Sequence, residues 1–236
     1  MTDAPRAVYA LPVPGIGEIG AGDDLAAIIA GHVALEAGDV VVVTQKVVSK
    51  AEGRLVEVGT DEAAERLRIV EEQSVRILRR RGELVISETG HGFVCANAGV
   101  DFSNVEAGWA ALLPVDPDRS ARRIRDGLRA RAGVEVAVVV SDTFGRPWRR
   151  GVTDVAIGCA GIAAVVDLRG SPDAGGRPLQ ATEICVADEI ASAAELVMGK
   201  DRGVPVAVVR GVDPAWLRPG SVVDEIVRPP AEDLFR

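Results

Sequence analysis

The apolar positions of this chain fall mostly in short, valine-rich runs that are separated by charged amphipathic segments. Short apolar runs bounded by Gly, Pro or Asp predict buried strands, whereas apolar positions that recur every three to four residues predict helices. On this basis we expect strands at 7–13, 40–44, 85–86, 93–95, 134–140, 162–168 and 205–209. We expect one helix from Asp23 or Asp24 to about Leu35, and others at 61–81, 120–132 and 189–198.

These elements are mixed without strict alternation, which predicts an α+β fold with mixed sheets and packed helices. No internal repeat and no long linker divides the 236 residues. We therefore expect a single domain, 1–236, with a candidate subdomain at about 60–95.

The predicted strand 134–140 ends in a cluster of residues that are suited to chemistry. Three side chains with oxygen atoms follow it directly: Ser141, Asp142 and Thr143. Open α/β sheets place their ligands at such strand ends, and these oxygens suit Mg²⁺ or Mn²⁺. Three arginines come next: Arg146, Arg149 and Arg150. A polar turn with solvated arginines would explain the same residues. Their density favours a site for a metal and an anionic substrate, because guanidinium groups match phosphate and carboxylate.

Lysine is rare in this chain, which has 24 arginines and three lysines, and its positions are therefore informative. Two of the three follow the predicted strand 40–44, in the segment that holds Gln45, Lys46, Ser49 and Lys50. A solvated loop is the simpler interpretation of this segment. The alternative is a phosphate site, because lysine serves as a compact positive charge toward phosphate.

A second carboxylate stands in a polar segment, 97–104, among asparagines and a serine. Asx-turn chemistry would explain the asparagines. A functional interpretation requires Asp101 to converge with Asp142, since two carboxylates can share a divalent ion that also holds the phosphates of a nucleotide.

Composition argues against several classes of function, although it leaves room for a local basic pocket. Only 3% of residues are aromatic and the formal charge is -8, which disfavours nucleic-acid binding and binding to membrane surfaces. No apolar run is long enough to span a bilayer, and the N-terminus has no signal-peptide core. Three scattered cysteines fit a reduced, cytoplasmic protein. With only two histidines, a Ser-His-Asp or Cys-His mechanism has little support.

The segment from Gly15 to Gly20 matches the GxGxxG pattern, which is weak on its own. The expected helix cap comes after the third glycine, and the next strand ends without an acidic residue for a ribose. A flexible loop is the simpler interpretation. A dinucleotide-dependent oxidoreductase built on this segment stays open as an alternative, whereas no GxxxxGK[ST] motif for a P-loop occurs.

Taken together, six colinear segments resemble the coenzyme F-420:L-glutamate ligase family. They are GDDL (22–25), GDVVVVTQKVVSKAEG (38–53), NAGVDFSNV (97–105), LLPVDPDRSA (112–121), SDTFGRPWRRGVTDVAIGCAG (141–161), and VADEIASAAELVMGK with PVAVVRG (186–211). The resemblance covers nearly the whole chain. It implies a family-specific ligase fold without a P-loop, an intertwined homodimer, and a match to the N-terminal domain of actinobacterial forms that carry an additional reductase domain. The end of this chain fits either a natural terminus or the edge of a longer protein.

The resemblance implies GTP-dependent ligation of L-glutamate to F-420-0 through an acyl phosphate, with extension of a γ-linked tail. Mg²⁺ or Mn²⁺ and K⁺ are the implied cofactors. Asp101 and Asp142 resemble ligands of a first metal, Thr143 resembles a ligand of a second metal, and Asp142 and Arg146 are the candidate catalytic residues. The implied nucleotide contacts are Pro14, Gly15, Ile16, Gly17, Gln45, Lys46, Lys50, Asn104, Met198, Gly199 and Lys200.

One position departs from the family pattern. Lys200 stands where an oxygen-bearing metal ligand is expected, and a protonated lysine cannot ligate a metal. Binding of a second metal is therefore in doubt. A protein that binds a deazaflavin coenzyme or a nucleotide without catalysis remains the alternative from another class.

Overall fold

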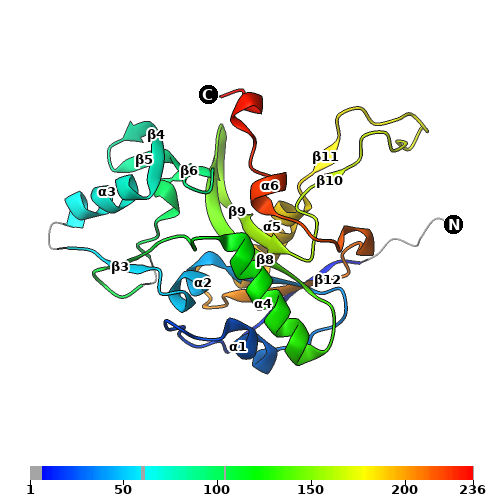
Figure 1. The fold of residues 1–236 in the computed structure, drawn as a ribbon, viewed down its shortest axis with the longest axis horizontal. Coiled ribbons are helices and arrows are strands. Elements are labelled where there is room, and N and C mark those ends of the chain that lie inside the picture. The colour runs from blue at the N-terminus through cyan, green and yellow to red at the C-terminus, as the bar shows by residue number, and fades with distance from the viewer. Residues whose placement is uncertain (1–6, 60–61, 104, 236) are drawn as a thin grey trace.

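The centre of the fold is a five-stranded mixed sheet (Figure 1). The computed structural model describes residues 7–59, 62–103 and 105–235. The strand order is β1 (Tyr9–Pro12), β12 (Val206–Arg210), β2 (Val40–Thr44), β8 (Ala137–Arg146) and β9 (Arg149–Ala160). β2 and β8 are parallel, and the other neighbouring pairs are antiparallel. The valine-rich strands therefore occupy the middle of the sheet, where both faces are buried.

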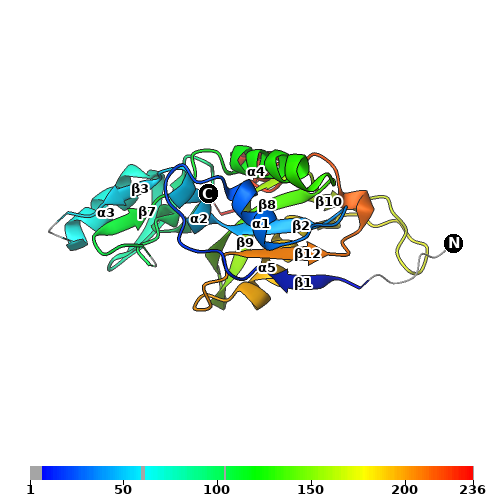
Figure 2. The same ribbon diagram turned by 90° about the horizontal axis from the view of Figure 1, so that it is seen from below.

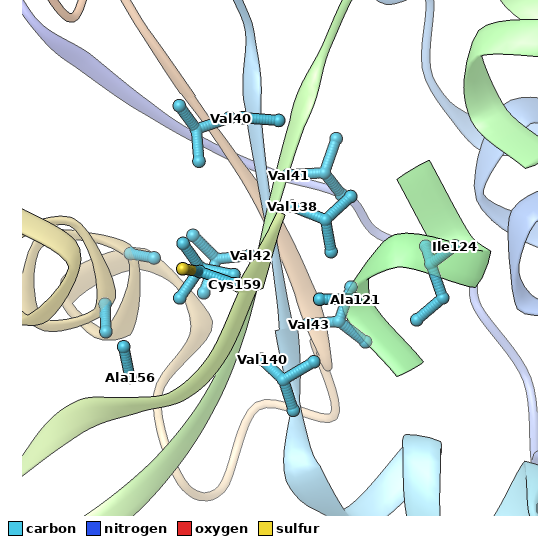
Figure 3. Packing of buried hydrophobic residues seen from close by; sticks show 14 of the residues in the cluster. Val40, Val41, Val42, Val43, Ala121, Ile124, Val138, Val140, Ala156 and Cys159 are labelled. Carbon is cyan, nitrogen blue, oxygen red and sulfur yellow. The ribbon is translucent and has the colours of Figure 1, made fainter. Parts of the chain in front are cut away.

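Helices cover both faces of this sheet. Figure 2 shows α1 (Leu25–His32) and α4 (Pro117–Ala132) on one side and α5 (Val186–Met198) on the other. In Figure 3, Val41 and Val43 point toward Ala121 and Ile124 of α4, whereas Val42 points to the opposite side. Successive side chains of a strand point to opposite faces, so an unbroken run of valines is what a sheet covered on both faces requires.

The helix ends are specified locally. The Asp24 carboxylate accepts a hydrogen bond from the Ala27 N–H at the start of α1. Asp116 caps α4 in the same way, and Pro117 occupies its first turn. α4 ends at Gly133, whose φ of 68° is a conformation that glycine adopts without strain. Because these capping residues are visible in the sequence, both helices were predicted close to their observed positions.

A smaller unit packs beside the main sheet. It contains a three-stranded sheet, a two-stranded sheet and one helix: β4 (Ser74–Arg81), β5 (Leu84–Thr89), β6 (Val94–Ala96), β3 (Leu55–Glu57), β7 (Trp109–Ala111) and α3 (Glu62–Glu72). Its own hydrophobic cluster runs from Val58 to Leu112. This unit is wider than the 60–95 segment, and the subdomain boundaries stay a prediction.

Short elements complete the fold. β10 (Val166–Asp167) pairs with β11 (Glu183–Ile184) at the base of a projecting arm, visible in yellow in Figure 1. The remaining elements are α2 (Gln45–Ala51), the 3-10 turns Asn97–Gly99, Pro214–Trp216 and Pro230–Glu232, and α6 (Val222–Glu225). In the described residues, no helix has the length and apolar character needed to cross a bilayer.

The α+β class with mixed sheets is confirmed, but several boundaries are wrong. The helix predicted for 61–81 ends at Glu72, and the rest forms β4. Arg76 of β4 pairs with Glu88 of β5 at 3.0 Å, so cross-strand contacts override the helical charge pattern. The segment after Thr44, interpreted as a loop, is the helix α2.

The strand predicted for 134–140 also continues much further than expected. β8 extends to Arg146 as one arm of a hairpin with β9, so Ser141 to Gly145 are in a strand and not in a turn. The strand predicted for 162–168 is reduced to Val166–Asp167. In both segments, pairing with a partner strand decided the outcome, and that pairing is not visible in a single run of sequence.

We predict that Gly158→Ala destabilises the fold by about 2–4 kcal/mol. A Cβ atom at this position of β9 would lie 2.3 Å from the carbonyl carbon of Pro117, which is backbone and cannot turn aside. Gly145→Ala on β8 is the control, because a Cβ atom there meets nothing within 4 Å. Urea denaturation measures both; equal effects of the two substitutions would contradict the prediction.

Candidate functional site

A cavity of about 1170 Å³ opens where the main sheet meets the smaller unit. It is lined from five directions: the loop before α1, the helix α2, the segment after β6 in the smaller unit, the strands β8 and β9, and the loop after α5. The parallel pairing of β2 with β8 ends at Thr44 and Ser141, and β8 has an irregularity between Val140 and Ser141. The cavity therefore lies at the end of a parallel strand pair, where α/β sheets place ligands.

Asp142 lies in the wall of this cavity on β8. Its Oδ1 accepts a hydrogen bond of 2.8 Å from the Thr143 N–H. Burial raises the pKa of Asp142 to about 7, and the negative charges of Asp101 and Asp154 add to the increase. Three carboxylates from three segments are therefore close enough to repel one another, and a cation among them would relieve that repulsion.

Asp101 lines the same cavity from the smaller unit and is paired with a lysine of α2. Its Oδ2 lies 2.9 Å from Lys46 Nζ, and its Oδ1 accepts hydrogen bonds of 2.7 Å from the backbone N–H and the hydroxyl of Ser103. Burial alone would raise the pKa of Asp101, but the bonds from Lys46 and Ser103 outweigh it, so the pKa is lowered. Asp101 is thus a charged carboxylate that already has a counter-ion.

Lys50 lies one helical turn beyond Lys46 and also faces the cavity. Its Nζ lies 2.9 Å from Glu18 Oε2. The Glu18 carboxylate is 92% exposed, and the hydrogen bond and charge of Lys50 lower its pKa. A phosphate can displace such an exposed partner at little cost, because surface ion pairs are weak.

Sequence reasoning missed a third acidic position, Asp154 on β9. Its carboxylate is 1% exposed and accepts hydrogen bonds from Ser141 Oγ at 3.1 Å and from Thr143 Oγ1 at 2.6 Å. Lys200 Nζ lies 3.2 Å from it. The sequence did contain a sign of this residue, because Asp154 is a single carboxylate inside an apolar segment. A charged residue at a buried strand position needs a polar or charged partner.

The cavity brings together ten of the residues predicted to form the site: Ile16, Gly17, Gln45, Lys46, Lys50, Asp101, Asp142, Thr143, Gly199 and Lys200. Of these, Gln45 uses its side-chain amide within the protein: Nε2 donates hydrogen bonds to Ser49 Oγ and to the Leu112 carbonyl. Polar lining residues that the sequence did not single out include Glu18, Ser103, Asp154 and Glu195.

Four other predicted residues do not line the cavity. Met198 is fully buried in the core, while Pro14 and Gly15 precede the lining segment. Arg146 is exposed near the tip of the β8–β9 hairpin, where it donates to the Arg150 carbonyl at 3.4 Å. Its catalytic role stays a prediction. Asn104 lies outside the described residues.

The dinucleotide alternative loses its geometric basis. β1 is an edge strand and β12 lies between it and β2, whereas a dinucleotide fingerprint requires the two parallel strands of its βαβ unit to be neighbours. The first turn of α1 begins at Leu25, well after Gly20, and the Asp24 carboxylate caps it. An anion bound at that helix end would meet a negative charge.

The donor set fits a Mg²⁺ or Mn²⁺ ion that is shared with a substrate. Among the described residues, no group of three or more His, Cys, Asp or Glu side chains is arranged to hold a metal. Mg²⁺ rarely needs such a cage, because it usually binds one or two carboxylates together with waters and substrate phosphates. Asp101 and Asp142, which face one cavity, would supply those two carboxylates.

Comparison with known proteins places this chain among ligases. The family model described as F420-0:Gamma-glutamyl ligase matches residues 15–211. The chain belongs to this family. A protein of Methanopyrus kandleri named coenzyme F420:L-glutamate ligase is 44% identical, over 95% of this chain and 96% of its own. Proteins with the same name from Methanothermobacter thermautotrophicus and Archaeoglobus fulgidus are 42% and 41% identical, over 95% and 97% of this chain and 97% and 96% of their own.

We predict that Asp142→Asn stabilises the metal-free protein at pH 8, by roughly 1–4 kcal/mol. The pKa of Asp142 is raised to about 7, so the folded state holds this proton more tightly than the unfolded chain does. That contribution is complete below about pH 4 and is lost as the pH rises through about 7. Wild type and variant should therefore differ at pH 8 and converge at pH 4, as measured by urea denaturation with a chelator present.

Asp101→Asn serves as the control with the opposite sign, because Lys46 and Ser103 lower the pKa of Asp101. It should destabilise the protein at pH 8. If Asp142→Asn also destabilises at pH 8, Asp142 contributes to the fold through its charge and the prediction is wrong.

Proposed function

We propose that this protein joins L-glutamate to coenzyme F-420-0 in a GTP-dependent reaction. The family and the names of its relatives support the substrate class. The observation that carries the proposal is the charge pattern of the cavity, in which Lys46, Lys50 and Lys200 reach acids that come from other segments of the chain. Lysines held this way suit a bound triphosphate.

The proposed reaction has two steps. A carboxylate oxygen of F-420-0 attacks the γ-phosphorus of GTP, the bond to the bridging oxygen breaks, and GDP leaves with an acyl phosphate remaining. The amine of L-glutamate then attacks the acyl carbon and loses a proton, and inorganic phosphate leaves. Repetition on the new terminal glutamate would extend a γ-linked tail.

The side chains of the cavity would position these anions and neutralise their charge. Lys46 and Lys50 would contact the phosphates, and Asp101 and Asp142 would hold Mg²⁺ or Mn²⁺. A divalent ion bound there supplies charge neutralisation for the transferring phosphoryl group. Catalysis of this kind depends on positioning and charge, which fits a site with no histidine among its described lining residues.

Two features of the proposal rest on family resemblance more than on the cavity. One is a homodimer, for which the exposed Trp148 and Val152 on the β8–β9 hairpin offer apolar surface. The other is K⁺ as an additional cofactor. A protein that binds the coenzyme or nucleotide without turnover is the remaining alternative from another class.

Incubation with F-420-0, L-glutamate, GTP and Mn²⁺ should give products heavier by whole glutamate residues, with release of GDP. Mass spectrometry of the coenzyme tests this.

We predict that Asp142→Asn lowers kcat by roughly 100-fold or more, because one charge of the metal site is lost. Asp167→Asn, in an exposed ion pair with Arg169, should retain full activity.

Binding of the substrates without any product would favour the non-catalytic alternative. A near-normal rate of Asp142→Asn at low Mn²⁺ would show that this carboxylate is not part of the active centre.

We further predict that Lys50→Ala raises KM for GTP about 10-fold and leaves KM for glutamate nearly unchanged. The reason is that loss of one charge-assisted contact to phosphate costs about 1.4 kcal/mol or more. Steady-state kinetics with each substrate varied in turn measures the difference. Equal increases in both constants would assign Lys50 to the fold.

A further inference from the structure

We propose that the ammonium group of Lys200 fills a cation position beside Asp154, so that the active cavity takes one divalent ion and not two. The inference rests on the proposed function only in assuming that a divalent ion binds at Asp101 and Asp142. It assigns Lys200 a role as a tethered cation, in addition to any contact with the nucleotide.

The surroundings of Asp154 are those of a cation site. Both of its oxygens face inward with the carboxylate 1% exposed. Ser141 donates to Oδ2, and Thr143 donates to Oδ1 from the facing strand β8. Hydroxyl groups satisfy hydrogen bonds but leave the negative charge in place, and a buried charge is costly without a counter-ion. In the described part of the chain, Lys200 is the residue that forms an ion pair with Asp154.

Neighbouring charges strengthen this requirement. The charge of Asp154 raises the pKa of Asp142, and it also raises that of Glu195 on α5, after the larger effect of burial. Asp101, Asp142, Asp154 and Glu195 therefore converge on one cavity. Sites of phosphoryl transfer often neutralise such a set of carboxylates with two metal ions. Here one metal ion and one ammonium group would neutralise it.

The backbone delivers Lys200 to this position. α5 ends at Gly199, whose φ of 64° turns the chain back toward the sheet while its N–H bonds to the Glu195 carbonyl at 3.0 Å. The side chain of Lys200 is 57% exposed, but its ammonium group reaches the buried carboxylate of Asp154. An ammonium group held this way offers charge but no lone pair, so it occupies the position without coordinating ligands.

The number of bound Mn²⁺ ions tests this proposal. The protein is stripped with a chelator and titrated with Mn²⁺ in the presence of a saturating non-hydrolysable GTP analogue, and free Mn²⁺ is followed by its electron paramagnetic resonance signal. Wild type should bind one Mn²⁺ per chain. Lys200→Gln should bind two, because an amide oxygen joins Asp154 and Thr143, whereas Lys200→Arg should still bind one.

Lys50→Gln is the matched control. It removes one ammonium from the same cavity, but the partner that it leaves, Glu18, is a single exposed carboxylate and should not gather a second ion. Circular dichroism checks that each variant is folded.

Two Mn²⁺ ions bound by the wild type would overturn the proposal, and so would one ion bound by folded Lys200→Gln. No Mn²⁺ bound by any variant would overturn it together with the metal site of the proposed function. One ion in wild type and two in Lys200→Gln, without ligase activity, would support the proposal and count against the proposed function alone.

Discussion

The site depends on one constraint: the negative charges of the carboxylates at the end of the β2–β8 pair need hydrogen-bond donors and positive charges beside them. Asp142 and Asp154 lie on neighbouring strands of the sheet; burial raises the pKa of Asp142, and the side chain of Asp154 is only 1% exposed. An uncompensated buried charge costs several kcal/mol, so the arrangement persists only with partners. Thr143 bonds to both, through its N–H to Asp142 and its hydroxyl to Asp154, and Lys200 supplies a positive charge. Among the described residues Asp142 forms no ion pair, so its carboxylate would suit an added cation.

The rest of the fold holds β9 in the position that this arrangement needs. Asp118 on α4 is buried and accepts hydrogen bonds from the Cys159 N–H at 2.8 Å, from Ser221 Oγ at 2.8 Å and from the Val222 N–H at 3.1 Å. One carboxylate therefore ties α4, β9 and α6 together. Gly158 lets the strand approach the first turn of α4 closely, and the same strand carries Asp154 to the cavity.

Local signals were enough to predict much of this structure, and non-local pairing explains the errors. The valine run at 40–44 and the caps of α1 and α4 act within a few residues, so those elements were placed well. The continuation of β8 depends on β9, and the end of α3 depends on β5. The same distinction applies to the site. Asp142, Lys46 and Lys50 stand at or just beyond predicted strand ends and were found from the sequence. Asp154 was not, because its partners come from elsewhere: the hydroxyls of Ser141 and Thr143 from β8, and the ammonium of Lys200 from the loop after α5.

The charge of the cavity also limits how anionic ligands can enter. Seven of its lining residues are acidic and three are lysines: Glu18, Asp101, Glu106, Asp142, Asp154, Glu195 and Asp201 against Lys46, Lys50 and Lys200. A phosphate near Lys46 competes with Asp101 for the same ammonium group, at a distance where Coulomb energies are large in a partly buried site. A cation at Asp101 would remove that competition, because Asp101 would then have another counter-ion and the Lys46 ammonium would be free for phosphate. The proposed cation and nucleotide therefore favour each other at this wall, since each supplies the partner that the other displaces.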